Sequence, residues 1–231
     1  MLSAGKKRME PIVVLHEEKH FAVAVKPAGV LSQPAPQATG SAPDMISLLA
    51  EQLASDIFPV HRLDRETAGV MLYAKTPFGA AKLSELVAHG GLEKQYLTAV
   101  HGVPEPEKGE MRDLLWHDAK KNKSYVVTRQ RGGVREALLD YERLAVSEYA
   151  GLPVSLARVR LHTGRTHQIR VQFSSRGMPL VGDSRYGSRE KCELCLFAER
   201  LSFVNPFTHG SASFAAKPKN EIFALFGDCI L

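Results

Sequence analysis

The segment from His61 to Gly69 reads His-Arg-Leu-Asp-Arg-Glu-Thr-Ala-Gly and places a carboxylate beside two guanidinium groups. Positive charge close to a carboxylate favours its ionised form and lowers its pKa by about 1 to 3 units. We therefore expect Asp64, flanked by Arg62 and Arg65, to be deprotonated, which suits a nucleophilic or electrostatic role better than proton donation. The alternative is a salt-bridged turn at the surface, because structural ion pairs perturb carboxylates too.

Arginines are concentrated in a second segment that contains no acidic residue. Between positions 158 and 176 the chain carries Arg158, Arg160, Arg165, Arg170 and Arg176. A patch of one sign at this density should attract a phosphate backbone. The overall balance of 30 basic and 25 acidic residues, with a net charge of +5 and a pI near 9.1, is only a mild bias toward polyanions. The clustering is the stronger of the two indications.

Five segments match, in order, the motifs of one enzyme family. They span about residue 12 to residue 187, and read Val25-Lys26-Pro27-Ala28-Gly29, the segment around Asp64, Glu93-Lys94-Gln95-Tyr96-Leu97, Thr163-Gly164-Arg165-Thr166-His167-Gln168-Ile169-Arg170 and Gly182-Asp183-Ser184-Arg185-Tyr186-Gly187. Each pattern is weak alone, but five in order are hard to obtain by chance. In these motifs the chain resembles the RluA-type pseudouridine synthases, which modify RNA.

The resemblance implies a catalytic set of Asp64, Tyr96 and Arg165. Asp64 matches the essential aspartate, and Arg165 matches the arginine that pairs with it. Tyr96 matches the tyrosine that stacks on the flipped base and can act as an acid-base group, although from the sequence alone a core tyrosine is the favoured interpretation. The residues that we expect to contact or position RNA, from resemblance or from charge, are Arg62, Arg158, Arg160, His167 and Arg170.

The implied reaction is the isomerisation of uridine to pseudouridine in structured RNA. The N-glycosidic bond breaks, the base turns in place, and the sugar is rejoined to C5. The uridine must be flipped out to reach a carboxylate in the protein, at a cost of a few kcal/mol. The residues do not show whether Asp64 attacks C1′ or C6, or whether a glycal forms. The reaction needs no cofactor and no metal, and the chain has no P-loop or Gly-x-Gly-x-x-Gly motif.

Composition favours a soluble intracellular protein, which we expect to be a cytoplasmic monomer. The resemblance implies that its partner is a stem-loop of ribosomal or transfer RNA. The chain of 231 residues is 44% hydrophobic, its apolar runs are too short to span a membrane, and residues 1–11 carry no secretory signal. We expect a flexible N-terminus over residues 1–10 and one catalytic domain over 11–231, with no room for the S4-type RNA-binding domain that the family often carries before it.

Hydrophobic periodicity predicts short strands alternating with a few helices. Helices should begin after the N-cap residues Asp44, Thr76 and Thr166, and the segment 28–43 should be a loop. Residues 104–112 should be a polar connection. Strands are expected over 12–15, 21–25, 69–75, 94–100, 124–129, 137–144, 154–161 and 194–204.

These elements predict an α+β fold, with a mostly antiparallel, twisted mixed sheet, flanking helices and a basic catalytic cleft. The resemblance implies that this is the pseudouridine synthase fold. Two other classes stay open: a protein with this fold that only binds RNA, and a zinc hydrolase using Cys192, Cys195 and His162. The chain departs from the family pattern at Ala68 and Phe197, which bears on the subgroup and hence on the substrate.

Overall fold

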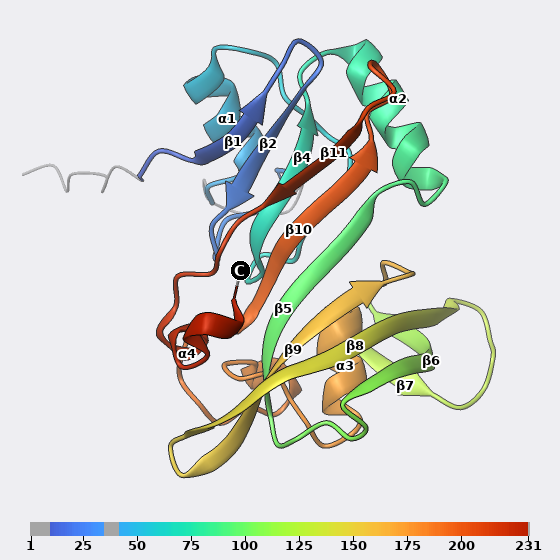
Figure 1. Ribbon diagram of the computed structural model, residues 1–231. Coiled ribbons are helices and arrows are strands. Elements are labelled where there is room, and N and C mark those ends of the chain that lie inside the picture. The colour runs from blue at the N-terminus through green and yellow to red at the C-terminus, as the bar shows by residue number, and fades with distance from the viewer. Residues whose placement is uncertain (1–9, 35–41, 231) are drawn as a thin grey trace, which may run out of the picture.

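A computed structural model describes residues 10–34 and 42–230 of the chain (Figure 1). The flexible N-terminus predicted for residues 1–10 lies almost entirely outside the described residues. The same is true of the centre of the loop predicted over residues 28–43.

The strands in the described part of the chain form one sheet of eleven. Its central order is β1-β2-β4-β10-β5-β9-β8-β6-β7, with β3 paired to β4 and β11 paired to β10. The strands are β1 (Val13–Glu17), β2 (Phe21–Lys26), β3 (Phe58–Pro59), β4 (Ala68–Ala74), β5 (Glu93–His101), β6 (Lys108–Asp118), β7 (Lys123–Val127), β8 (Val134–Tyr149), β9 (Leu152–Leu161), β10 (Leu196–Val204) and β11 (Ser211–Ala215).

Four α-helices and two short 3-10 helices accompany the strands in the described residues. They are α1 (Met45–Leu53), α2 (Pro77–Ala88), α3 (Gln168–Ser174), α4 (Glu221–Ala224), η1 (Ser184–Tyr186) and η2 (Gly227–Cys229). The predicted N-caps of the first two helices are confirmed. Asp44 accepts a hydrogen bond from the Ser47 amide, and Thr76 accepts one from the Gly79 amide.

The third predicted N-cap is wrong. Helix α3 begins after His167, whose backbone is left-handed at φ 56° and whose side chain does not cap the helix. Instead, the side chain of Gln168 holds the preceding loop: its Oε1 accepts hydrogen bonds from the Arg165 amide and the Thr163 hydroxyl. The loop is therefore closed from inside the helix rather than by Thr166.

The predicted fold class is confirmed. All strand pairs are antiparallel except β4 with β10. The polar connection predicted over residues 104–112 is wrong in its second half, because strand β6 begins at Lys108. Strand β6 pairs with β8, which is longer than the strand predicted over residues 137–144. In β6 and β8, charged residues are interspersed with buried ones. Neither strand therefore forms a continuous apolar run that the sequence would reveal.

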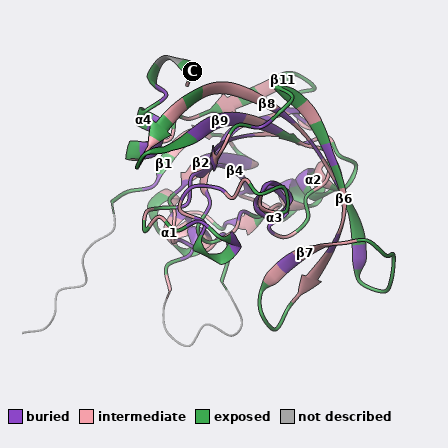
Figure 2. Ribbon diagram, turned by 90° about the horizontal axis from the view of Figure 1, so that it is seen from below, coloured by how far each residue is buried: buried purple, intermediate pink, exposed green. Residues whose placement is uncertain are grey.

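Both faces of the sheet are covered. On one face, α1 and α3 pack with Tyr96 and Val159 in the largest core cluster. On the other face, α4 packs with Leu97 and Leu156. The sheet is strongly curved, with α1 and α3 on its concave side (Figure 2). No helix in the described residues is long and apolar enough to cross a membrane.

The single parallel contact of the sheet depends on Gly69. Its φ is +129°, and a Cβ built there would lie 2.4 Å from the backbone nitrogen and oxygen of Ala198. Glycine is the residue that permits both this conformation and this close approach. The contact joins β4, which follows Asp64 by four residues, to β10 at the centre of the sheet.

Gly69→Ala should therefore lower the free energy of unfolding by about 2 to 4 kcal/mol, because β10 must move and the alanine backbone is strained. Urea denaturation measures this difference. The matched control is Gly132→Ala, where a Cβ meets no atom within 4 Å and the change should be close to neutral. Equal losses in the two variants would show that the strand contact does not constrain position 69.

Candidate active site

Asp64, Tyr96 and Arg165, which form the predicted catalytic set, line one cavity of about 270 Å³. The three residues come from the loop before β4, from β5, and from the loop before α3. His61, Arg62, His167 and Arg170 also line this cavity. Asp64 also lines a second cavity of about 410 Å³. Its side chain is 21% exposed.

Two side chains from the segment 26–32 fix the backbone on either side of Asp64. The Ser32 hydroxyl donates to the Leu63 carbonyl at 2.8 Å and accepts from the Leu63 amide at 3.0 Å. The fully buried Lys26 ammonium donates to the carbonyls of Pro27, Val30 and Arg65 at 2.7 to 2.9 Å. Burial lowers the pKa of Lys26 to about 8, an effect that the nearby Glu66 and Asp64 carboxylates oppose.

The arginine that pairs with Asp64 is Arg170, not Arg165. One guanidinium nitrogen of Arg170 lies 3.4 Å from Asp64 Oδ2, and two others hold Asp183 at 2.7 and 2.8 Å. Arg165 is exposed and its Nε donates to the backbone carbonyl of Glu136. The prediction failed because Arg165 lies before the helix, whereas Arg170 points from its first turn toward the carboxylate.

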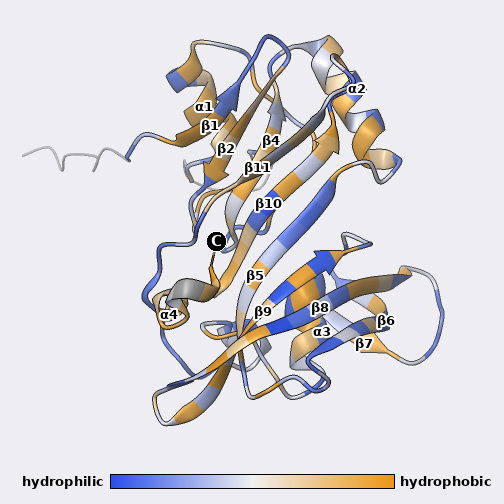
Figure 3. Cartoon of the chain, viewed as in Figure 1, coloured by the Kyte–Doolittle hydropathy of each residue, from blue (hydrophilic) through white to orange (hydrophobic). Residues whose placement is uncertain are grey.

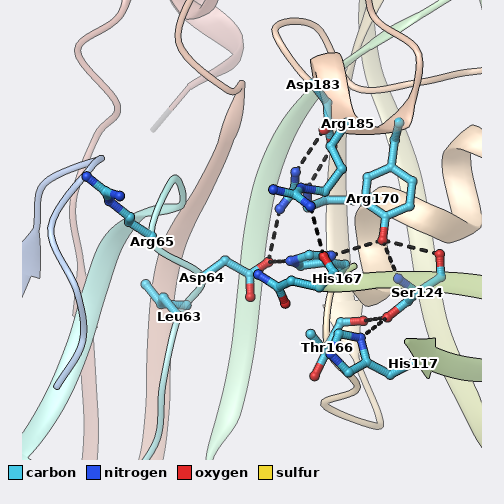
Figure 4. A network of polar contacts seen from close by, with 12 residues as sticks. Leu63, Asp64, Arg65, His117, Ser124, Thr166, His167, Arg170, Asp183 and Arg185 are labelled. Atoms are coloured by element: carbon cyan, nitrogen blue, oxygen red, sulfur yellow. Dashed lines mark hydrogen bonds and ion pairs between the residues drawn. The ribbon is translucent and has the colours of Figure 1, made fainter. Parts of the chain in front are cut away.

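The flanking arginines do not neutralise Asp64 either. Arg65 donates through Nε to the Gly29 carbonyl, and Figure 4 shows its side chain directed away from Asp64. Arg62 is exposed and makes no ion pair with any described residue. The charge partner of Asp64 thus comes from a distant helix rather than from its sequence neighbours.

His167 connects Asp64 to a buried network of polar groups (Figure 4). Its Nε2 lies 3.7 Å from Asp64 Oδ2, and its Nδ1 shares a hydrogen bond of 2.9 Å with the Tyr186 hydroxyl. That hydroxyl accepts from the Ser124 amide on β7. Burial lowers the pKa of His167 to about 4, with the Asp64 charge opposing, so the imidazole is neutral at pH 7. Arg170 therefore supplies the positive charge at this carboxylate.

Tyr96 is largely buried and lines the cavity. Burial raises the pKa of its phenol, and the Asp64 charge raises it further. The hydroxyl therefore stays protonated at neutral pH. The ring packs in the same core cluster as Ile169.

Four of the five arginines between 158 and 176 are paired with carboxylates from other elements. The pairs are Arg158 with Glu199, Arg160 with Glu93, Arg170 with Asp183 and Asp64, and Arg176 with Asp113. The predicted phosphate contact of Arg158 is not supported, because Arg158 shares the α4 face of the sheet with Leu156 and lies opposite the cavity. Arg160 is exposed at the edge of a neighbouring cavity.

Cys192 and Cys195 lie in contact, but His162 does not join them. Cys195 is buried, and desolvation raises the pKa of its thiol to about 12. His162 instead bonds Asp140 on β8. In the part of the chain that the structure describes, no three His, Cys, Asp or Glu side chains are placed to hold a metal ion.

Comparisons with known proteins show the family of this chain. Residues 20–175, more than half of the chain, match the family model for RNA pseudouridylate synthase. The dual-specificity RNA pseudouridine synthase RluA of Pasteurella multocida is 33% identical over 213 residues, covering 89% of this chain and 92% of the relative. The chain belongs to the RluA-type RNA pseudouridine synthases.

Another relative and a solved structure also support this family and fold. An uncharacterized RNA pseudouridine synthase of Aquifex aeolicus is 34% identical over 85% of this chain and 66% of its own length. Human RNA Pseudouridylate Synthase Domain Containing 1 shares the fold, with a TM-score of 0.78 at 22% identity, covering 96% of this chain and 91% of that one. The enzyme is an isomerase that acts on RNA.

The sequence did not predict the roles of three residues that hold the synthase site in place. Lys26 and Asp183 lie in two of the matched motifs, so their positions were marked but their roles were not. Ser32 lies outside all five motifs, in the loop after Lys26-Pro27. Its two bonds to Leu63 are visible only once the chain has folded back on itself.

Ser32→Ala should lower the free energy of unfolding by about 1 to 3 kcal/mol, because the buried amide and carbonyl of Leu63 lose their partner. It should also lower kcat about tenfold or more with little change in KM, since Asp64 is then held less precisely. Urea denaturation and single-turnover kinetics measure the two effects. Ser55→Ala, where an exposed hydroxyl is removed, is the control. A variant with unchanged stability and normal kcat would show that the Ser32–Leu63 hydrogen bonds do not position Asp64.

Arg170→Met should cost about 3 to 5 kcal/mol of stability, because the Asp183 carboxylate, 1% exposed, is left buried without a counter-charge. The matched control is Arg176→Met, which breaks a pair of the same type with Asp113 nearer the surface and should cost about 1 kcal/mol or less. Thermal and urea unfolding compare the two. Equal losses would mean that Arg170 is not anchored by Asp183.

Proposed function

We propose that this enzyme converts specific uridines in a stem-loop of ribosomal or transfer RNA to pseudouridine, as a monomer, with Asp64 as the central group. Relatives are named as a ribosomal large subunit pseudouridine synthase and a tRNA pseudouridine synthase. The observation that best supports the proposal is the Asp64 carboxylate, ion-paired with Arg170 and facing a cavity that Tyr96 also lines.

The size of this cavity supports base flipping. About 270 Å³ is near the lower end of small-ligand pockets, which suits one nucleobase with part of its sugar. The cavity is open to the surface, so a uridine rotated out of its stack can enter at the usual cost of a few kcal/mol. Ile169 and Leu63 supply apolar wall on either side of Asp64.

We assign to Asp64 the covalent or electrostatic step on the flipped uridine. The bond from N1 to C1′ breaks, a bond from C5 to C1′ forms, the C5 proton is released, and N1 gains a proton, so the reaction is an isomerisation with no net reagent. Arg170 lies beside one carboxylate oxygen at 3.4 Å, and the second oxygen, which bonds no described residue, can meet C1′ or C6. Both routes, and a route through a glycal, use an ionised carboxylate.

We assign to Tyr96 a stacking role rather than the role of general base. A raised phenol pKa beside a negative carboxylate opposes loss of its proton. An aromatic ring that stacks on a base contributes on the order of 1 to 3 kcal/mol of binding, whatever the base. The flipped uracil is then held against the ring while it turns.

Mapping of pseudouridines by carbodiimide primer extension, in cells with and without this gene, tests the proposal. At least one site should be lost without the gene and restored by the wild-type protein. Asp64→Asn should bind the same RNA but lose at least about a thousandfold in rate. Asp56→Asn, at an exposed aspartate outside the site, is the matched control and should restore modification. Restored modification by Asp64→Asn would falsify the mechanism, and a protein that binds RNA without changing any uridine would be only an RNA-binding module.

A further inference from the structure

Lys94 lies where two cavities meet. It belongs to the beginning of β5, which is hydrophilic where the strand leaves the α2 loop (Figure 3). The catalytic cavity and a neighbouring cavity of about 420 Å³ are both lined by Lys94, Gly164 and Arg165. The two spaces therefore adjoin at these residues.

The Lys94 ammonium makes no hydrogen bond or ion pair with any residue that the structure describes, although its side chain is half-buried. A Cβ placed on Gly164 would lie 3.8 Å from its Nζ, which sets the ammonium against that loop. Burial lowers the pKa of Lys94, which shows that its charge is partly desolvated without compensation.

Two other lysines that are at least partly buried have protein partners. The buried Lys26 donates to three carbonyls, and Lys75 pairs with Glu17. A desolvated charge without a partner lowers stability, so folding alone gives no reason to keep one at position 94. An anion that binds there would restore the lost solvation.

A second unpartnered donor lines the same cavity. Nε2 of His61 accepts a hydrogen bond from the Leu72 amide, so its Nδ1 carries the proton, and that nitrogen is buried without a partner. Burial lowers the pKa of His61 to about 3, and the Lys94 charge lowers it further, so the ring is neutral. A cation and a neutral imidazole therefore lie close together in the lining of this cavity, where an anion can pair with the cation.

We infer that Lys94 and Arg165 bind a backbone phosphate of the target nucleotide at the boundary between the two cavities. This inference rests on the proposed function, because it places the flipped base in the catalytic cavity and the continuing strand in its neighbour. When a base rotates inward, its phosphates stay at the cavity mouth, where these two cations lie. A phosphodiester carries the negative charge that Lys94 needs, whereas a uracil carbonyl is neutral.

Stability distinguishes this role from a structural one. Lys94→Met keeps the apolar stem and removes the unpaired charge, so it should raise the Tm of the free protein at neutral pH. The folded protein holds the Lys94 proton less tightly than the unfolded chain. The penalty is thus largest below the folded pKa, and the Tm difference should shrink as pH rises toward 10.5. A structural lysine would give the opposite change.

Binding of a fluorescein-labelled nine-nucleotide oligouridylate, measured from low to high salt, tests the contact. Lys94→Met should bind about tenfold more weakly at low salt, and the slope of log K against log salt should fall by about 0.7, as expected for one lost phosphate contact on a single strand. Lys94→Arg should keep the slope. Lys82→Met, on an exposed side chain of α2, is the control and should change neither quantity.

Equal slopes for wild type and Lys94→Met would overturn the inference, and so would a lower Tm in that variant. Neither result depends on whether the protein isomerises uridine. If Lys94→Met lowers the slope of log K against log salt but the wild-type protein modifies no uridine, the phosphate contact would stand and the proposed reaction would be wrong.

Discussion

The site depends on one guanidinium shared unequally between two carboxylates. Arg170 holds Asp183 with two short bonds, at 2.7 and 2.8 Å, and approaches Asp64 at only 3.4 Å. The buried Asp183 therefore fixes the arginine, and the arginine presents its remaining nitrogen to Asp64. Because that contact is long and single, Asp64 keeps a counter-charge without being fully occupied by it. A bidentate pair would have protected the carboxylate from a substrate.

The backbone around Asp64 is also held by residues that do not bind its carboxylate. Ser32 holds the residue before it and Lys26 the residue after it, while Asp64 makes its side-chain contacts only toward the cavity. The close approach of Ala198 at Gly69 then fixes the strand that follows. The aspartate is thus positioned through its neighbours, which lets its carboxylate face open space without losing its geometry.

Local rules predicted the elements that local chemistry determines. The caps Asp44 and Thr76 and the strand that carries Tyr96 follow from patterns within a few residues, and the family motifs marked Asp64. The partner of Asp64 could not be found this way, because the chain offers Arg62, Arg65, Arg165 and Arg170 and only folding selects among them. The helix start at His167 was missed for a related reason: its left-handed backbone is set by tertiary contacts to Tyr186 and Asp64.

The arginine cluster shows why charge counted along the sequence overstates a nucleic-acid surface. No acidic residue lies between 158 and 176, yet Glu199, Glu93, Asp183 and Asp113 arrive from other strands and loops to neutralise four of the five arginines. Three cations that pair with no carboxylate among the described residues, Arg62, Lys94 and Arg165, line the catalytic cavity. A charge retained without a protein partner is costly, so its position is a better guide to the path of an RNA strand than the density of arginine in the sequence.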